Sequence, residues 1–274
     1  MIEPGPPKAD RSADSVTKDS ASPLVTISVI SHGDGRRLQP LLASLAKYED
    51  AGRVQIIVTD NMGRDLPEIS VHGWHSLRVI RNAAPRGYAR NHNESFRQAQ
   101  GIYFCILNPD VELLEPTMEA LLAILQAGSA DIVAPLVVDP EGQVQDSFRR
   151  LPTPWGLVGR WVGRSPGRVE APTAQLEYVD WIAGIFMLMR SKTFSVLGGF
   201  DQAYRLYFED VDLCTRARLM GLRIAVSTRT RLQHDAQRSS RRLGRHLTWH
   251  VQSAVRFFAS DVYRRARRMA DYHA

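Results

Sequence analysis

The chain has 274 residues, 44% of them hydrophobic, which is enough to bury the core of one large α/β domain. Its formal net charge of +6 indicates an anionic partner or substrate. The two cysteines, Cys105 and Cys214, lie far apart, which argues against a disulfide framework or a cysteine metal site. There is neither a signal-peptide core nor an apolar run near the roughly 18 residues that span a bilayer. We therefore expect a cytoplasmic protein.

Along the chain, short apolar runs alternate with amphipathic stretches. Residues 1–22 are rich in Pro, Ser and Asp, and we expect a disordered lead-in there. The expected strands are 25–30, 54–58, 77–80, 102–107, 131–134, 178–189 and 222–226. The expected helices are 36–48, 86–100, 116–126, 191–197 and 210–220. This β-α-β succession predicts an α/β domain with a mostly parallel, mixed central sheet flanked by helices. Residues 139–175 hold five prolines and are expected to form a long loop.

A cluster of carboxylates marks the second half of the chain. Glu209, Asp210 and Asp212 fall within four positions, just behind the turn-like segment 198–201. Carboxylates so close together are costly to bury unless a proton or a cation joins them, so the cluster suits proton abstraction or cation binding. The alternative is an acidic first helical turn favoured by the helix dipole. Within it, Asp212 and Arg216 have the spacing of a structural ion pair.

Two aspartates follow apolar strands upstream of this cluster. Asp60 ends one predicted strand, and Asp110 follows another in the sequence Leu107-Asn108-Pro109. Ligand sites of α/β sheets form at the carboxyl ends of strands, so we expect both aspartates at one site. His234 is the third candidate segment. Taken alone, Asp60 also fits a turn residue and His234 an ordinary satisfied histidine.

The C-terminal residues 237–274 are expected to form a basic amphipathic helical segment. Nine arginines and only three aspartates occur from Asp235 to Ala274, and Trp249, Phe257 and Phe258 contribute to an apolar face. A basic helix with aromatic residues suits an anionic membrane surface. The alternative is a terminal helix that packs on the domain. No nucleic-acid motif accompanies the charge, so no nucleic acid is expected as a partner.

Taken together, the segments resemble glycosyltransferase family 2, with its GT-A fold, and within it the rhamnosyltransferase-like branch. The resemblance covers about residues 24–236. It rests on Ile27-Ser-Val-Ile-Ser-His-Gly33, Ile57-Val-Thr-Asp-Asn61, Asn82, Arg86-Gly-Tyr-Ala-Arg-Asn91, Leu107-Asn-Pro-Asp-Val111, Trp181-Ile-Ala-Gly184, Gly198-Gly-Phe-Asp201, Phe208-Glu-Asp-Val-Asp-Leu213 and His234. It implies one GT-A domain over residues 23–236, with a nucleotide-sugar half at about 23–138 and an acceptor half at about 176–236.

The resemblance also implies the chemistry: inverting transfer of a sugar from a nucleotide-sugar donor to a hydroxyl acceptor. Asp110 and His234 correspond to the ligands of a divalent metal, Mg²⁺ or Mn²⁺. Asp210 corresponds to the general base, with Glu209 in reserve. The usual acidic pair of the family is replaced here by Asn-Pro-Asp, which leaves Asn108 as an orienting amide rather than a direct ligand.

Substrate-binding residues follow from the same correspondence. The donor side comprises Ser31, His32, Asp60, Arg86, Gly87 and Asn108. The acceptor side comprises Trp181, Ala183 and Gly184. The position of Asp60 implies a contact with a pyrimidine ring and hence a UDP- or TDP-sugar. The segment 31–33 departs from the Thr-Tyr-Asn commoner in the family, which leaves the base open.

The branch resemblance favours rhamnose as the sugar and a lipid-linked or polysaccharide acceptor of cell-envelope synthesis, at the inner face of the plasma membrane. Two other readings remain. A non-catalytic relative that binds nucleotide-sugar or glycan as a scaffold would fit the departures at residues 31–33 and Asn108. A nucleotidyltransferase would require a glycine-rich basic loop after the first strand, which residues 33–36 imitate only poorly.

Overall fold

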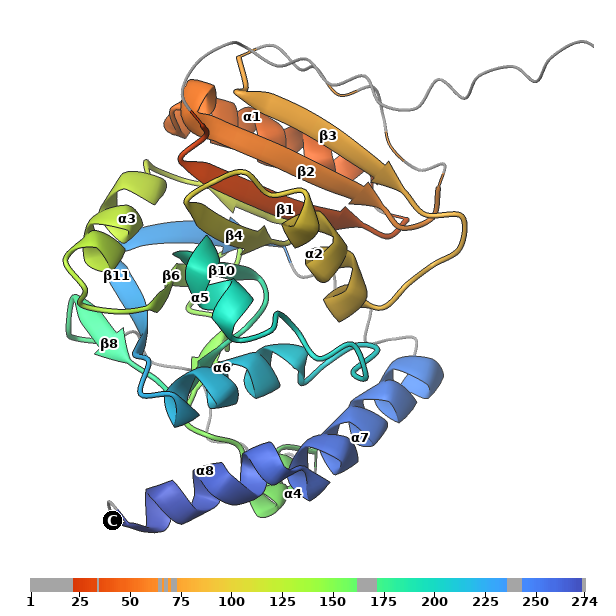
Figure 1. Ribbon diagram of the computed structural model, residues 1–274, viewed down its shortest axis with the longest axis vertical. Helices are drawn as coiled ribbons and strands as arrows, with labels where there is room; N and C mark the ends of the chain where they lie inside the picture. Colours follow the sequence, from red (N-terminus) through yellow and green to blue (C-terminus); the bar gives the residue numbers. More distant parts are fainter. Residues whose placement is uncertain are drawn as a thin grey trace, which may run out of the picture.

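The computed structural model describes residues 22–33, 35–63, 66, 69, 73–161, 172–235 and 243–272. The expected lead-in therefore lies outside the described residues, except for residue 22. A curled central sheet is flanked by helices, and the two C-terminal helices lie along one end of the molecule beside α6, which spans Glu209–Leu219 (Figure 1).

The first half of the chain forms the parallel part of the sheet, and one of its strands ends at the polar residue Asp60. This part contains β1 (Val25–Ser31), β2 (Val54–Asp60), β3 (Ser76–Arg81) and β4 (Tyr103–Leu107), which pair in parallel in the order β3-β2-β1-β4. Every residue of β1, β2 and β4 is buried, as expected for strands covered on both faces. Asp60 ends β2, as the sequence predicted.

Beyond β4 the sheet becomes mixed, in the order β10-β6-β11-β5. These strands are β10 (Phe186–Arg190), β6 (Ile132–Val138), β11 (Ile224–His234) and β5 (Val111–Leu113). β10 runs antiparallel to β4 and β6, while β6 and β11 are parallel. β8 (Leu176–Tyr178) pairs with β11 at the side, and β7 (Phe148–Arg149) with β9 (Trp181–Ile182) forms a separate ribbon. The predicted mixed α/β sheet is thus confirmed.

The helices either flank this sheet or, as with the last two, pack beside α6. They are α1 (Leu38–Tyr48), α2 (Tyr88–Arg97), α3 (Met118–Gln126), α4 (Pro154–Trp161), α5 (Ser191–Val196), α6 (Glu209–Leu219), α7 (Leu243–Ala259) and α8 (Asp261–Tyr272), with short 3-10 turns at Gly35–Arg37 and Ala51–Arg53. Leu38, Leu41 and Leu45 of α1 are fully buried, and their helical spacing gives α1 an apolar face toward the core.

Three expected elements were wrong in detail. The stretch 139–175 contains β7 and α4 rather than only a loop, although residues 162–171 lie outside the described part. The single strand expected at 178–189 is divided among β8, β9 and β10, because β8 pairs with β11, β9 with β7 and β10 with β4. The strand expected at 222–226 continues as β11 to His234, past an irregularity between Ser227 and Arg231.

Of the expected C-terminal helical segment, residues 243–272 form two helices that meet at Ser260, and the remainder lies outside the described residues. The Ser260 hydroxyl accepts a hydrogen bond from Tyr263 N at 3.1 Å and so caps the start of α8. A second apolar cluster attaches both helices to the domain. It consists of Leu157, Tyr204, Phe208, Val211, Ala254, Phe257 and Tyr263. Packing on the domain is therefore observed. Of the helices described, none combines the length and the apolar character needed to cross a membrane.

Candidate active site

The two residues expected to hold a metal meet at the edge of the sheet. β5 pairs antiparallel with β11, and His234 lies opposite Val111 in this register. The pairing places His234 Nε2 3.3 Å from Asp110 Oδ1. On its other side, His234 Nδ1 lies 2.8 Å from Gln145 Oε1, and the Gln145 amide donates to His234 O at 2.6 Å. The imidazole is held in place from both sides.

The donor atoms of this pair fit a divalent cation. Asp110 Oδ1 is buried and has no hydrogen-bond donor. The other oxygen, Oδ2, accepts a hydrogen bond from Arg37 Nη1 at 3.0 Å, and this guanidinium also donates to Asp235 O at 2.9 Å. A carboxylate oxygen and an imidazole nitrogen are ligands that Mg²⁺ or Mn²⁺ accepts. Within the described ranges, no group of three or more His, Cys, Asp or Glu side chains could hold a metal. A bound cation would therefore need further ligands from elsewhere.

The expected base lies behind a strained turn. Tyr207 and Phe208 have φ values of 71° and 66°, the left-handed region that bulky side chains rarely adopt. Two such residues in succession cost free energy and persist because the surrounding packing holds them. Phe208 belongs to the second apolar cluster, and the turn leads directly into Glu209 at the start of α6.

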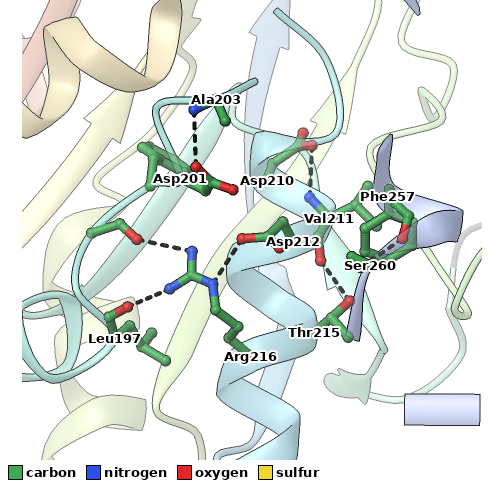
Figure 2. A network of polar contacts seen from close by, with 12 residues as sticks. Leu197, Asp201, Ala203, Asp210, Val211, Asp212, Thr215, Arg216, Phe257 and Ser260 are labelled. Atoms are coloured by element: carbon green, nitrogen blue, oxygen red, sulfur yellow. Dashed lines mark hydrogen bonds and ion pairs between the residues drawn. The ribbon is translucent and has the colours of Figure 1, made fainter. Parts of the chain in front are cut away.

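Both carboxyl groups of this turn are held in an unusual environment. Asp210 Oδ2 accepts a hydrogen bond from Gly184 N at 3.1 Å. Its Oδ1 accepts one from Val211 N at 2.8 Å (Figure 2). Burial raises the pKa of Asp210. Burial and then the charge of Asp210 raise the pKa of Glu209 well above its usual range, and Glu209 Oε2 is buried without a hydrogen-bond partner. A carboxylate with a raised pKa is a stronger base once it is ionised.

Asp212 has a different role from its two neighbours. Arg216 Nε donates to Asp212 Oδ2 at 2.7 Å, which confirms the predicted ion pair (Figure 2). The same guanidinium donates to the backbone oxygens of Leu197 and, at 2.9 Å, Gly199. Arg216 therefore connects the turn at Leu197–Gly199 to α6 and helps to fix the position of the helix that carries Asp210.

On the donor side, three asparagines form a buried network at the ends of β2 and β3 and the start of α2. Asn61 Oδ1 accepts hydrogen bonds from Arg86 N and from Asn82 Nδ2, both at 2.8 Å. Asn61 Nδ2 donates to Arg86 O at 2.9 Å, and Asn82 Nδ2 also donates to Asn91 Oδ1 at 2.8 Å. This amide network (Asn61, Asn82 and Asn91) sets the backbone position of Arg86.

The predicted donor residues lie around this network in different settings. Asn61 Nδ2 lies 2.9 Å from His32 Nδ1, so His32 is attached to the amide network. Ser31 pairs with Asp60 across β1 and β2, and both are buried. Asp60 Oδ1 accepts hydrogen bonds from Met62 N at 3.1 Å and Gly63 N at 2.8 Å. Those bonds belong to the turn role that the sequence left open for Asp60; its contact with a pyrimidine ring stays a prediction.

A cavity of about 1100 Å³ opens beside the amide network. It is lined by Ile30, His32, Gly33, Asn61, Met62, Pro85, Arg86, Gly87, Tyr88, Asn91, Arg205, Leu206, His246 and Trp249. Gly87 has a steric reason to be glycine, because a Cβ there would lie 2.8 Å from Arg205 O. The metal pair is not part of this lining: Asp110 faces a separate hollow of about 410 Å³.

Tyr88, which sequence reasoning gave no role, connects these parts. It lines the cavity, and its hydroxyl donates to Gly184 O at 2.6 Å and reaches Asn108 Oδ1 at 3.4 Å. Since Gly184 N donates to Asp210, one tyrosine joins the donor side to the expected base. A Cβ on Gly184 would lie 2.8 Å from the Tyr88 hydroxyl, so the contact requires glycine there.

The other predicted acceptor residues border this contact. Trp181 Nε1 donates to Arg150 O at 3.2 Å, and the ring packs against the second apolar cluster. Ala183 lies between Trp181 and Gly184 and is half-buried. The structure thus places all three on the segment that passes Asp210, although none of them lines the large cavity.

Besides Tyr88, the sequence alone did not single out Arg37, Arg205 or His246, and it placed Trp249 only on the apolar face of the C-terminal segment. Arg37 contacts Asp110, while Arg205, His246 and Trp249 line the cavity. Tyr88 lies inside the family-like segment 86–91 and was therefore accessible to sequence reasoning. The other four carry no local motif, because long-range packing alone brings them to the site.

Solved structures with a similar fold are glycosyltransferases. TarS of S. aureus in complex with UDP-GlcNAc superimposes with a TM-score of 0.57 at 16% identity, covering 87% of this chain and 67% of that one. GalNAc-T7, solved with UDP, GalNAc and Mn²⁺, gives a TM-score of 0.58 at 14% identity, covering 79% of this chain and 44% of that one. At these identities the similarity shows the GT-A fold alone.

Curated relatives cover most of the chain. It is 28% identical over 259 residues to N-acetylglucosaminyl-diphospho-decaprenol L-rhamnosyltransferase of Mycobacterium tuberculosis (strain H37Rv), covering 86% of this chain and 84% of the relative. It is 28% identical over 248 residues to rhamnosyltransferase WbbL of Escherichia coli K12, covering 86% and 93%. The family model "Glycosyl transferase family 2" matches residues 26–212, more than half of the chain. The chain therefore belongs to glycosyltransferase family 2.

Proposed function

We propose that the protein transfers a rhamnosyl group from a pyrimidine nucleotide-sugar to a lipid-linked acceptor in cell-envelope glycan synthesis. The observation that carries the proposal is the connection from the cavity through Tyr88 and Gly184 to Asp210. A nucleotide-sugar in the cavity would have its reacting carbon near a carboxylate suited to accept a proton. The names of the two relatives support rhamnose as the sugar.

In this mechanism Asp210 accepts the proton of an acceptor hydroxyl. The hydroxyl oxygen forms a bond to the anomeric carbon while the bond from that carbon to the nucleotide diphosphate breaks, which inverts the configuration. Hydrogen bonds from Gly184 N and Val211 N orient the carboxylate. Glu209 is more deeply buried than Asp210, and the two carboxyl groups interact electrostatically. Glu209 is the second candidate for the base.

The leaving diphosphate develops negative charge, which the cavity is suited to stabilise. Arg86 lines it beside the predicted donor residues, and α2 begins there at Gly87 with no side-chain cap. Asp110 and His234 would hold a divalent cation, which would supply further positive charge where the diphosphate reaches the separate hollow that Asp110 faces. Arg37 keeps one Asp110 oxygen engaged, so the buried Oδ1 is the atom left for the cation.

A membrane location would suit a lipid-linked acceptor. On α8, Arg264, Arg265, Arg267 and Arg268 are exposed, while Tyr263 and Ala266 pack inward. Exposed guanidinium groups on one helix favour binding to a membrane surface that contains anionic lipids. The acceptor named for the M. tuberculosis relative is itself a lipid diphosphate carrying a sugar. We propose peripheral association with the inner face of the plasma membrane on these grounds.

A donor panel tests the proposal. TDP-rhamnose and UDP- and GDP-sugars are compared for thermal stabilisation with Mg²⁺ or Mn²⁺, since stabilisation grows with the logarithm of ligand concentration over Kd. TDP-rhamnose should stabilise most, UDP-sugars less, and a short-chain lipid diphosphate sugar should then accept rhamnose. Preference for a GDP-sugar would refute the pyrimidine donor, and binding without any transfer would favour the non-catalytic alternative.

A separate experiment tests whether Asp110 and His234 hold the metal. Asp110→Ala and His234→Ala should remove the metal-dependent part of nucleotide binding measured by calorimetry. Glu141→Ala, which removes an exposed carboxylate that follows β6, should not. If both site variants bind the nucleotide diphosphate with Mn²⁺ as tightly as the parent protein, this pair does not hold the metal.

A further inference from the structure

The C-terminal helix α7 forms part of the cavity wall. His246 and Trp249 come from α7, and Arg205 and Leu206 come from the loop that precedes α6. The donor residues, by contrast, come from the ends of β1 and β2 and the start of α2. The cavity is therefore built by two groups of elements, and only one of them belongs to the expected nucleotide half.

The part contributed by α7 and the loop combines aromatic and cationic groups. The Arg205 guanidinium carbon lies 4.6 Å from the Trp249 ring centroid, a cation–π distance. The His246 and Trp249 rings meet edge to face at 5.3 Å. No carboxylate occurs among the described residues that line the cavity, so this wall attracts anions. An indole also suits the apolar face of a sugar.

This wall is anchored to the same turn that carries the expected base. The Tyr207 hydroxyl lies 3.2 Å from His246 Nδ1, and Ser253 of α7 donates to Leu206 O at 2.9 Å. Phe208 packs on Phe257 of the same helix, with ring centroids 5.5 Å apart. Glu209 and Asp210 follow without a gap in the chain. A ligand on this wall would thus be positioned relative to Asp210.

We infer that Arg205, His246 and Trp249 form the acceptor subsite, which binds a sugar through the indole and its phosphate-linked end through the guanidinium. The inference rests on the proposed function, since it presumes an acceptor with a sugar diphosphate. The cavity volume of about 1100 Å³ exceeds the roughly 300–1,000 Å³ of ordinary ligand pockets, so parts of both substrates fit. The acceptor hydroxyl must reach the base, and Arg205 of this wall lies only five residues before Asp210 in the chain.

Kinetics with a short-chain lipid diphosphate sugar test the inference without a membrane. Trp249→Ala and Arg205→Ala should each raise the acceptor KM by about tenfold, while the Kd for the nucleotide diphosphate changes less than about twofold. Trp155→Ala and Arg53→Ala serve as controls, because both side chains are exposed and neither lines the cavity. Trp249→Phe replaces the alanine variant if its melting curve shows unfolding.

Direct calorimetric binding of the acceptor analogue separates the two proposals. If the parent protein binds the analogue and the variants do not, the subsite is supported even where no rhamnose is transferred. If transfer occurs but the variants keep the parent's acceptor KM, the subsite assignment is wrong and the proposed function stands. Loss of nucleotide affinity with an unchanged acceptor KM would assign the wall to the donor diphosphate and overturn the inference.

Discussion

The amide network and the acidic turn (residues 207–210) differ in how their polar groups are paired, although both belong to one site. Asn61 has hydrogen-bond partners for both its amide oxygen and its amide nitrogen, and it carries no charge. The acidic turn holds two carboxyl groups with raised pKa, one of them with an unpartnered oxygen, behind two left-handed residues. Hydrogen-bonded polar groups stabilise a fixed conformation. The acidic turn instead destabilises the folded state through backbone strain and buried carboxyl groups, and such strain is typical of functional sites.

The contrast suggests a division of work between them. A neutral, fully bonded network can position the backbone around a nucleotide without competing for its charge. A buried carboxylate close to its neighbour is poorly solvated, and it therefore gains more from accepting a proton. Changes in the network should mainly affect binding, and changes in the turn should mainly affect the chemical step.

The largest effect is expected for Asp210→Asn. The amide keeps the shape of the side chain but cannot accept a proton, so transfer should fall by roughly two to four orders of magnitude while donor binding stays within about twofold. Single-turnover transfer and nucleotide calorimetry measure the two quantities. Glu209→Gln should cost less; a nearly active Asp210→Asn beside an inactive Glu209→Gln would move the base to Glu209.

This division was only partly visible in the sequence. Periodicity and the apolar runs predicted the order of strands and helices, because local patterns decide which face is buried. The carboxylates were found because they are unusual in type and spacing. The raised pKa of Glu209 was not, since it depends on burial under residues far away in the chain.

The cavity wall was less accessible still. The sequence of the C-terminal segment indicates a basic amphipathic helix with an aromatic face, but it does not indicate what that face packs against. That His246 and Trp249 reach the cavity follows from packing of Phe257 and Tyr263 on the domain, which no local pattern encodes. The break at Ser260 was missed because a serine inside a helical pattern does not by itself end a helix.

A smaller effect, on affinity, should follow from Asn61→Ala. It removes four hydrogen bonds that connect His32, Asn82 and the backbone of Arg86, and it leaves some partners unsatisfied at about 1–3 kcal/mol each. Nucleotide affinity measured by calorimetry should fall about tenfold or more, with the transfer rate at saturating donor much less changed.

Asn93→Ala is the matched control for that experiment. Asn93 also bonds backbone groups, donating to Phe200 O at 2.8 Å and accepting from Phe200 N at 2.9 Å, but it does not line the cavity. It should lower the melting temperature while nucleotide affinity stays near the parent value. Equal loss of affinity in both variants would show that general destabilisation, rather than the amide network, controls binding.

The smallest effect concerns stability against pH and tests whether the acidic turn is costly. Glu209 has a folded pKa raised above the usual 4.5, chiefly by burial. Its favourable contribution is therefore complete below about that pH and is lost as pH rises through the folded pKa, where the buried group ionises. Glu209→Gln stays neutral, so its melting temperature should exceed the parent's by about 3 °C or more near neutral pH and by little near about pH 4.5.

Asp212→Asn provides the contrast within the same helix. It breaks the ion pair with Arg216 and leaves a guanidinium with only its backbone partners, so it should lower the melting temperature at neutral pH. Thermal melts across the pH range measure both variants. If Glu209→Gln gains no stability as pH rises, the carboxyl is not held at a cost, and the difference drawn between the amide network and the acidic turn would rest on Asp210 alone.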